Sequence, residues 1–393
     1  MNLTNNEKDI ILTDNEGAML GDKTLNSNVL LIGNAGMGKS FNYFLPNILQ
    51  ANTSFVINDT YGAMYKQTKD FLTQNGYCIR VLNLSELEYS DKYNPFEYCY
   101  NNGYLDKNAV TDMVASMLTV PDGFTGNSYI ARNLINDSMR LLVSAICMYL
   151  IETQDKEKHN FENVMELLSK PLSELDKIIT KPDGKLKVLS IKTYMQFRKT
   201  KLSSDIKTAT YKRMQEIFTD EFLKATKYDS IDIERINDRK TAVFIISSPS
   251  SSHSFLANIL ISQIYTILLS KENAEIPTHF MLDNFSNIPK IERVSVYLSI
   301  CRIKKINTSI AVQTIGQLKA LYPNWMELVA NCDNQLFFGN CDVETLNYIN
   351  SSGDINLKKI NFKECVLLQR GRTAVYDLKY DIAKHKNYKY LSK

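Results

Sequence analysis

Short apolar runs, each bounded by polar or turn residues, recur near both ends of the chain and predict buried strands of a mainly parallel sheet. The first three runs and the last three alternate with helical patterns, as in successive βαβ units. This alternation predicts an α/β fold. The predicted strands are Val29–Ile32, Phe55–Ile57, Ile79–Leu82, Ala242–Ile246, Phe280–Leu282, Ser309–Val312 and Leu336–Phe338.

The middle of the chain, from about Lys107 to Asn237, has no convincing strand pattern and reads as helical. Helical patterns cover Asn127–Ile151, Phe161–Leu168 and a lysine-rich stretch from Lys177 to about Phe222. We therefore predict an all-α domain of residues 107–237, inserted into an α/β domain made of residues 1–106 and 238–393. Near the C-terminus, Glu364–Leu368 and Thr373–Tyr376 flank Gln369-Arg370-Gly371-Arg372 and predict a hairpin at a sheet edge.

Composition narrows the class of protein. With 44% hydrophobic and 23% charged residues, the 393-residue chain has the composition of a globular protein, and its net charge of +3 does not imply a polyanionic partner for the whole chain. Seven dispersed cysteines and four histidines form no zinc pattern and indicate a reducing compartment. No uninterrupted apolar stretch is long enough to span a bilayer, so we expect Leu141–Ile151 to be a buried helix.

The segment Gly33–Ser40 matches the pattern G-x-x-x-x-G-K-[ST] in full. It follows an apolar strand and precedes a helical pattern, which is the context that a phosphate-binding loop requires and that a chance glycine-rich turn lacks. Lys39 is expected to reach the β- and γ-phosphates of ATP, and Ser40 to bind Mg²⁺. The predicted nucleotide-binding residues are Gly33, Gly36, Gly38, Lys39, Ser40 and Phe41.

Asp283 directly follows the predicted strand around Phe280–Leu282 and is the candidate second Mg²⁺ ligand. Its separation from Lys39, 283 − 39 = 244 residues, is what an inserted domain would produce. The alternative is a strand-end residue that caps the next helix. The following position, where a glutamate usually activates water, holds Asn284. Asparagine orients water but accepts no proton, so a general-base contribution of about 10²–10⁴-fold is absent.

Two further features leave alternatives open. Gln313 ends the strand Ser309–Val312 and is a candidate γ-phosphate sensor or water-positioning residue, or else a solvated loop residue. The stretch from Lys177 to Arg213 holds eleven basic and two acidic residues, a local charge of +9. With Tyr194, Phe197 and Tyr211 among these charges, it predicts either a surface for single-stranded DNA or a solvated helical face with core aromatics.

The order of motifs resembles the cytosolic part of the type IV secretion coupling proteins, the ATPases of conjugative DNA transfer, in the form found in Gram-positive mobile elements. The matching segments after the phosphate loop are Phe44-Leu45-Pro46-Asn47, a strand ending at Asp59, Tyr93-Asn94-Pro95-Phe96, Asp283–Ile288, Gln313…Gln317-Leu318, Asn331-Cys332-Asp333, Asp342-Val343-Glu344-Thr345 and Lys384–Tyr388. The resemblance implies a RecA-like domain with an all-α insertion, ATP and Mg²⁺ between the subunits of a hexamer, and a cytoplasmic position at the inner face of the membrane. The implied partners are a relaxase and other relaxosome proteins, single-stranded DNA and the type IV secretion channel ATPases. The family's membrane helices precede the phosphate loop, where this sequence has 32 residues.

The sequence departs from the family pattern at three places. The segment Asp-Pro-Lys-Gly-Glu reads Asp59-Thr60-Tyr61-Gly62-Ala63, and Asn284 replaces the glutamate. A typical Arg-Ser-Arg-Gly reads Arg302-Ile303-Lys304-Lys305, which makes Arg302 either the candidate arginine finger in trans or a surface arginine. The leading hypothesis is an ATP-driven coupling protein, and the second is a nucleotide-binding adaptor without productive hydrolysis. An unrelated ABC or AAA+ ATPase finds no support, because neither an ABC signature nor a C-terminal helical lid is present.

Overall fold

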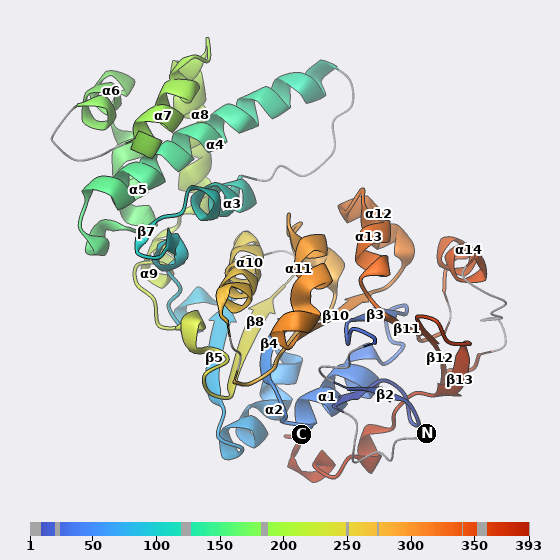
Figure 1. Cartoon of the computed structure of the whole chain (residues 1–393). Coiled ribbons are helices and arrows are strands. Elements are labelled where there is room, and N and C mark those ends of the chain that lie inside the picture. Colours follow the sequence, from blue (N-terminus) through green and yellow to red (C-terminus); the bar gives the residue numbers. More distant parts are fainter. Residues whose placement is uncertain are drawn as a thin grey trace. The chain divides into compact units, whose positions relative to one another are not determined.

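A computed structural model describes residues 9–19, 24–118, 127–181, 188–248, 251–272, 275–339, 341–351 and 360–392. The chain forms two compact units (Figure 1). The sheet unit comprises Met1–Ser85, Asp232–Ala257 and Ile264–Lys393, and the helical unit comprises Glu86–Ile231 and Asn258–Gln263. The units therefore divide after residues 85 and 231, whereas the sequence placed its boundaries after residues 106 and 237.

The sheet unit is built on nine strands, of which the seven from β11 to β5 are parallel and the two at the other edge are antiparallel. All seven strands predicted from the sequence are present, and the predicted α/β fold class is confirmed. In spatial order the strands are β13 (Val375–Leu378), β12 (Glu364–Gln369), β11 (Asn334–Phe337), β3 (Val29–Ile32), β10 (Ile306–Val312), β9 (Thr278–Leu282), β4 (Ser54–Thr60), β8 (Thr241–Ser247) and β5 (Cys78–Asn83).

Helices cover both faces of this sheet (Figure 1). On one face, α1 (Leu45–Leu49) and α2 (Ala63–Gln74) bury the side chains of alternate strand residues in one apolar cluster. On the other face, the Tyr265 ring of α10 (Phe255–Ser270) stacks on Phe280 with the ring centroids 3.7 Å apart. The remaining helices of the unit are α11 (Val294–Ile300), α12 (Ile315–Leu321), α13 (Trp325–Ala330) and α14 (Val343–Ser351), with 3-10 turns η5 (Ile233–Arg235), η6 (Phe285–Asn287) and η7 (Cys301–Lys304).

The C-terminal hairpin differs from its predicted position. Its second strand, β13, runs two residues later than the predicted Thr373–Tyr376, because residues 372–374, after the turn at Gly371 (φ 75°), do not pair with β12 in the sheet. Beyond β13 the chain forms two 3-10 turns, η9 (Ile382–Lys384) and η10 (Tyr388–Tyr390). Lys384 of η9 pairs with Asp14, and the Tyr390 ring of η10 packs on Phe71 of α2. A short hairpin at that start, β1 (Ile10–Ile11) with β2 (Gly17–Ala18), was not predicted.

In the helical unit, no strand lies among the described residues of 107–237. A small hairpin, β6 (Tyr100–Asn101) with β7 (Tyr104–Leu105), precedes the helices. The helices are α3 (Lys107–Met117), α4 (Asn127–Thr153), α5 (Phe161–Ser169), α6 (Leu172–Thr180), α7 (Val188–Arg198), α8 (Ser203–Ile217) and α9 (Asp220–Ala225), with 3-10 turns η2 (Leu87–Tyr89), η3 (Pro95–Tyr98) and η4 (Lys156–Lys158). Among the described residues, the segment Asn133–Thr153 of α4 has the length and apolar composition of a membrane span, and 61% of its apolar window is buried. The burial is consistent with the buried helix expected around Leu141–Ile151.

Candidate functional site

The phosphate loop, Gly33–Ser40, connects the carboxyl end of β3 to a helical turn. Gly36 and Gly38 have φ angles of 77° and 85°, in the left-handed region that glycine adopts without strain. Gly33 is constrained differently: a Cβ atom there would lie 2.9 Å from the Cβ of Phe338. Glycine is therefore needed at positions 36 and 38 for the backbone conformation of the loop, and at position 33 for close packing against Phe338.

The turn after the loop is π-helical (η1, Ser40–Phe44) and leads into α1. The N–H of Leu45 donates to the carbonyl of Ser40, five residues back. The next residue, Pro46, has no N–H, and its ring crowds the carbonyl of Asn42, so a regular α-helical turn is disfavoured here. Phe41 is 46% exposed at this turn, and its contact with nucleotide remains a prediction.

Lys39 folds back onto its own loop. Its Nζ atom donates to the carbonyls of Gly33, at 2.5 Å, and Asn34, at 3.2 Å, and the residue is only 8% exposed. Burial lowers the pKa of Lys39, and the nearby charge of Asp283 counteracts that shift. The ammonium group is thus held at the loop by backbone dipoles and a carboxylate.

Ser40 and Asp283 meet although 243 residues separate them in the sequence. The Oγ of Ser40 donates to Oδ2 of Asp283 at 3.0 Å, because β3 and β9 both neighbour β10 and end at the same edge of the sheet. Burial raises the pKa of Asp283, and the Ser40 hydroxyl and the Lys39 charge oppose the shift. A hydroxyl and a carboxylate at this spacing are oxygen donors of the kind that Mg²⁺ takes, so the residues fit that ion.

A second carboxylate, Asp59, lies near the end of β4, which neighbours β9. Its Oδ2 accepts the backbone N–H of Tyr65 at 2.7 Å, which caps the first turn of α2. Burial raises the pKa of Asp59 to about 6, the backbone hydrogen bonds oppose this shift, and the charge of Asp283 adds to it. Two acidic groups therefore share one buried edge of the sheet, where the charge of Asp283 disfavours ionisation of Asp59.

Asn284 adopts a left-handed backbone conformation, with φ 48° and ψ 48°. Asparagine tolerates this region better than most residues with a side chain. The backbone N–H of Asn284 donates to Oδ1 of Asp283 at 2.9 Å, and its Nδ2 donates to Oγ1 of Thr60 at 3.2 Å. The residue at the usual glutamate position is thus bonded to the neighbouring strand end and has no carboxylate.

Gln313 follows β10 at the same edge and is half-buried. Its backbone N–H donates to Oε1 of Gln317 at 3.0 Å, and the hydroxyl of Ser286 donates to the same oxygen at 3.2 Å. Gln317 therefore links the segments that follow β9 and β10. No role for Gln317 was predicted from the sequence, although it belongs to a segment that resembles the family.

Comparison with known proteins identifies the family. Residues 3–357 match the family described as "Type IV secretory system Conjugative DNA transfer", which is most of the chain. The chain belongs to this family. The resemblance to type IV coupling proteins is thereby confirmed. No curated protein matches the sequence.

Solved structures agree on the fold of this family member. The bacterial conjugative coupling protein TrwBdeltaN70 in its unbound monoclinic form matches with a TM-score of 0.69 and 14% identity, covering 90% of this chain and 85% of the other. TrwB in complex with ADP and Mg²⁺ matches with a TM-score of 0.65 and 14% identity, covering the same shares. VirB4 of Thermoanaerobacter pseudethanolicus matches with a TM-score of 0.58 and 12% identity, covering 96% of this chain and 98% of the other. At these identities the likeness supports a shared fold.

The structure does not bring Arg302 to the phosphate loop of its own chain. Arg302 is exposed in η7, which precedes β10, whereas Gln313 follows that strand. The seven residues of β10 span about 20 Å, so Arg302 lies at the opposite end of the sheet. Any contact of Arg302 with nucleotide would have to be made with a neighbouring copy, as the family resemblance implies.

Most of the described lysines of the lysine-rich stretch are exposed, whereas Lys207 and two of the three aromatic residues of the stretch are buried. Tyr194 and Phe197 are fully buried in the helical unit, so these two rings are core residues and do not stack on bases. Tyr211 is half-buried beside the Lys207 ammonium, which lies 5.5 Å from its ring centroid. Exposed lysines of the described stretch are Lys177, Lys181, Lys192, Lys199, Lys201 and Lys212, whereas Asp183, Lys185 and Lys187 lie outside the described residues.

Contacts with the C-terminal segment were not predicted. The Nζ of Lys379 donates to the carbonyl of Met37 in the phosphate loop at 2.9 Å. The Nδ2 of Asn42, in the turn after the loop, donates to the carbonyl of Tyr380 at 2.9 Å. No local pattern signals pairs that lie 342 and 338 residues apart, since only the folded sheet brings them together.

Proposed function

We propose that this chain is an ATP-binding coupling protein of conjugative type IV secretion, which receives a relaxase–DNA complex and drives single-stranded DNA toward the transfer channel. The observation that carries the proposal is the contact between Ser40 and Asp283 beside the buried ammonium of Lys39. Solved structures of TrwB, which has a similar fold, are complexes with ADPNP and with ADP and Mg²⁺, and these complexes support a nucleotide as the ligand.

In this proposal the N–H groups of the phosphate loop and the Lys39 ammonium bind the nucleotide's phosphates. Lys39 exchanges its bonds to the Gly33 and Asn34 carbonyls for bonds to phosphate oxygens. Ser40 and Asp283 hold Mg²⁺, which neutralises charge on the phosphates when it is bound. Gln313 and Asn284 orient the attacking water at the same strand ends.

The partners proposed are a relaxase, other relaxosome proteins, single-stranded DNA and the type IV secretion channel ATPases. The exposed lysines of α6, α7 and α8 supply positive charge for the DNA phosphates. Arg302 acts as a finger from a neighbouring subunit of a hexamer, since it lies at the other end of the sheet from the loop of its own chain. The proposed location is the cytoplasmic face of the cell membrane.

A second candidate function is an adaptor that binds nucleotide and docks substrate proteins without productive hydrolysis. Asn284 favours it, because its amide accepts no proton and is bonded to Thr60. In the first function, hydrolysis proceeds slowly with a water that is positioned without a general base. In the second, nucleotide binding alone changes the conformation.

Measuring Mg-ATP affinity and phosphate release on one set of purified variants tests both functions. Wild type is expected to bind Mg-ATP and to release phosphate faster with single-stranded DNA, and Lys39→Ala is expected to do neither. Turnover that appears in Asn284→Glu but not in wild type would favour the adaptor. Asn284→Gln is the matched control, because it has the size and the backbone strain of the glutamate without its carboxylate. Wild type that binds no Mg-ATP would contradict both functions.

A further inference from the structure

Lys379 is a buried amine that the proposed chemistry does not use. It follows β13, is 6% exposed, and donates from Nζ to the carbonyl of Met37 at 2.9 Å. The ring centroids of Phe338 and Phe362 lie 4.8 Å and 4.7 Å from Nζ. Within the part of the chain that the structure describes, no carboxylate forms an ion pair with this amine.

A buried ammonium without a carboxylate is costly to keep charged. Burial lowers the pKa of Lys379 to about 8, and the charge of Lys39 contributes in the same direction, while Cys365 opposes it. Two lysines therefore place positive charge at one glycine-rich loop. An anion in the loop is the partner that would stabilise both charges.

The contact also orders the loop. In a phosphate loop the N–H groups face the ligand, and carbonyls directed toward it would repel phosphate. The Lys379 ammonium holds the Met37 carbonyl, and the next residue, Tyr380, accepts a hydrogen bond from Asn42 just after the loop. Two consecutive residues of the C-terminal segment thus hold both ends of the turn that contains Gly38 and Lys39.

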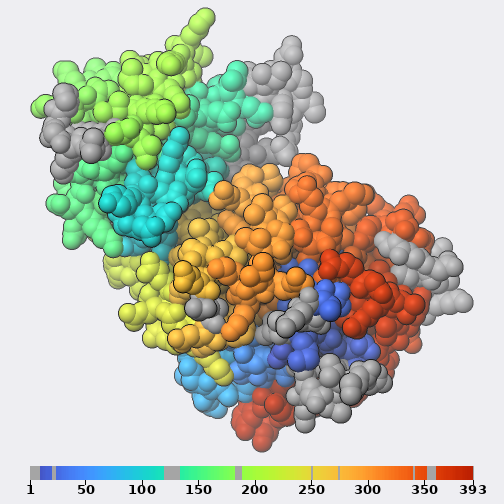
Figure 2. All heavy atoms as spheres, in the orientation of Figure 1, coloured from blue at the N-terminus to red at the C-terminus, as the bar shows by residue number. Residues whose placement is uncertain are grey.

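The C-terminal segment is itself docked by several contacts. Asp14 accepts a 2.6 Å ion pair from Lys384, and its N–H donates to the carbonyl of Leu378. The N–H of Ser392 donates to the carbonyl of Gln67 in α2. In Figure 2 the red C-terminal residues lie beside the blue N-terminal residues over the surface of the sheet unit.

We propose that Lys379 is a second lysine of the phosphate loop, a positioning residue that orients the Met37 carbonyl and adds positive charge for the phosphates of ATP. The C-terminal segment after β13 thereby becomes part of the nucleotide site, and nucleotide binding stabilises its docking. This inference rests on the proposed nucleotide binding. It assigns a role to a residue outside the sequence motifs of the site.

The test compares Mg-ATP affinity and thermal unfolding for wild type, Lys379→Met, Lys379→Arg and Lys386→Met. Methionine keeps an unbranched apolar chain near the two rings, and arginine keeps the charge. Lys386→Met removes an equal charge from an exposed residue of the same segment that makes none of the docking contacts named above. We expect Lys379→Met to raise the Kd for Mg-ATP roughly tenfold without lowering the melting temperature of the nucleotide-free protein, whereas the other two variants stay near wild type.

Amide hydrogen exchange supplies a second readout that a purely structural role would not move. By linkage, Mg-ATP is expected to slow exchange in residues 377–392 of wild type and to do so less in Lys379→Met. An unchanged Kd in Lys379→Met, or a melting temperature that falls while the Kd does not rise, would overturn the inference. Wild type that binds no Mg-ATP would instead contradict the proposed function, so the two failures are distinguishable.

Discussion

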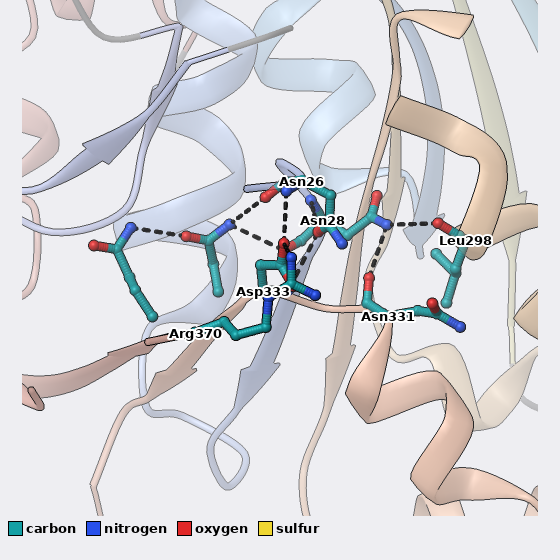
Figure 3. A network of polar contacts seen from close by, with 8 residues as sticks. Asn26, Asn28, Leu298, Asn331, Asp333 and Arg370 are labelled. Carbon is teal, nitrogen blue, oxygen red and sulfur yellow. Dashed lines mark hydrogen bonds and ion pairs between the residues drawn. The ribbon is translucent and has the colours of Figure 1, made fainter. Parts of the chain in front are cut away.

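The two ends of the parallel strands differ in the polar groups that they bury. At the amino ends of β3, β10 and β11, buried amide side chains form hydrogen bonds with backbone groups. At the carboxyl ends of β3, β9 and β4 lie a buried lysine and two buried carboxylates. At the amino end, Asn28 donates from Nδ2 to the carbonyls of Leu298 and Asn331 (Figure 3). Its Oδ1 accepts the N–H of Thr308. Asp333 accepts the N–H of Asn26 there. The bonding groups at this end are mostly uncharged.

The carboxyl end has the opposite character. Burial lowers the pKa of Lys39 and raises the pKa of Asp59 and of Asp283, so each charged form is disfavoured where it lies. A fold selected only for stability would not keep three such groups together. The comparison indicates that polar burial supports the fold at one end of the sheet and provides for a charged ligand at the other.

The amino end is not completely paired. Among the described residues, Oδ1 of Asp333 and both amide atoms of Asn307 are buried without a hydrogen-bond partner. The distinction between the two ends therefore lies in charge more than in the number of bonds. Variants that remove one group from each end test whether this distinction holds.

The largest effect is expected at Lys39. We expect Lys39→Met to weaken Mg-ATP binding by at least about 100-fold, or roughly 3 kcal/mol, because it removes the ammonium that binds the phosphates in the proposed function. The free energy of unfolding without nucleotide should not fall, since the variant also removes a buried charge. Titration with Mg-ATP measures the loss of affinity, and urea unfolding of the same preparations measures the free energy of unfolding. If Lys39→Met lowered both stability and Mg-ATP affinity, the carboxyl end would support the fold as the amino end does, and the proposed difference between the two ends would be wrong.

The next effect is expected at Asn28, where the substitution should lower the free energy of unfolding and leave Mg-ATP affinity nearly unchanged. Asn28→Ala leaves two carbonyls and one N–H without their partner, which lowers the free energy of unfolding by about 3 kcal/mol. Mg-ATP affinity of the folded variant should stay within about threefold of wild type, because the change lies at the far end of β3. Asn324→Ala, at an exposed asparagine, is the control and should cost less than about 0.5 kcal/mol. A large loss of affinity in Asn28→Ala would show that the two ends are coupled.

These two residues also illustrate what sequence could predict. The phosphate loop, the strand before it and Asp283 were predicted from local patterns, namely the loop motif and the apolar runs of the strands. Asn28 has no such pattern, because its partners come from α11, the end of α13 and β10. The contact of Lys379 with Met37 could not be predicted for the same reason, because residues 342 positions apart meet only when the sheet has folded.

Other differences between the predictions and the structure arise because a pattern of charges in the sequence does not show which side chains are buried. Tyr194 and Phe197 stand among lysines in the sequence, yet α7 turns both rings into the core of the helical unit. The hairpin shift of two residues arose because a turn can lengthen without changing the alternation on either side. Arg302 is exposed in η7 before β10, and its role as an arginine finger in trans stays a prediction.

An intermediate effect is expected from His279, which lies near the amino end of β9. Burial lowers its pKa to about 3, and its Nε2 lies 2.7 Å from the hydroxyl of Ser309. The unfolded state takes up a proton near pH 6.5 and the folded state does not, so stability present above that pH is lost as the pH falls. We expect a loss of about 1.4 kcal/mol between pH 7.5 and 5.5 from this residue.

Urea unfolding of wild type and His279→Gln across that pH range isolates the effect. The variant should lack this part of the acid dependence. His385, whose pKa burial lowers to about 4, contributes equally to both proteins and cancels. Equal pH dependence in the two proteins would mean that His279 takes up its proton in the folded state, and the amino end would then tolerate charge.

The smallest effect is expected from Arg370, the basic partner of Asp333 in the amino-end network of Figure 3. Its guanidinium lies 3.0 Å from Oδ2 of Asp333 but is 59% exposed, so solvent screens the pair. Arg370→Ala keeps the backbone N–H that donates to the Asp333 carbonyl, and Asn26 still donates to Oδ2. We expect a loss below about 1 kcal/mol that shrinks further in 1 M salt, measured by urea unfolding at low and high salt. A loss above about 2 kcal/mol that disappears in salt would mean that an ion pair stabilises the amino end, and charge would then no longer distinguish the two ends of the sheet.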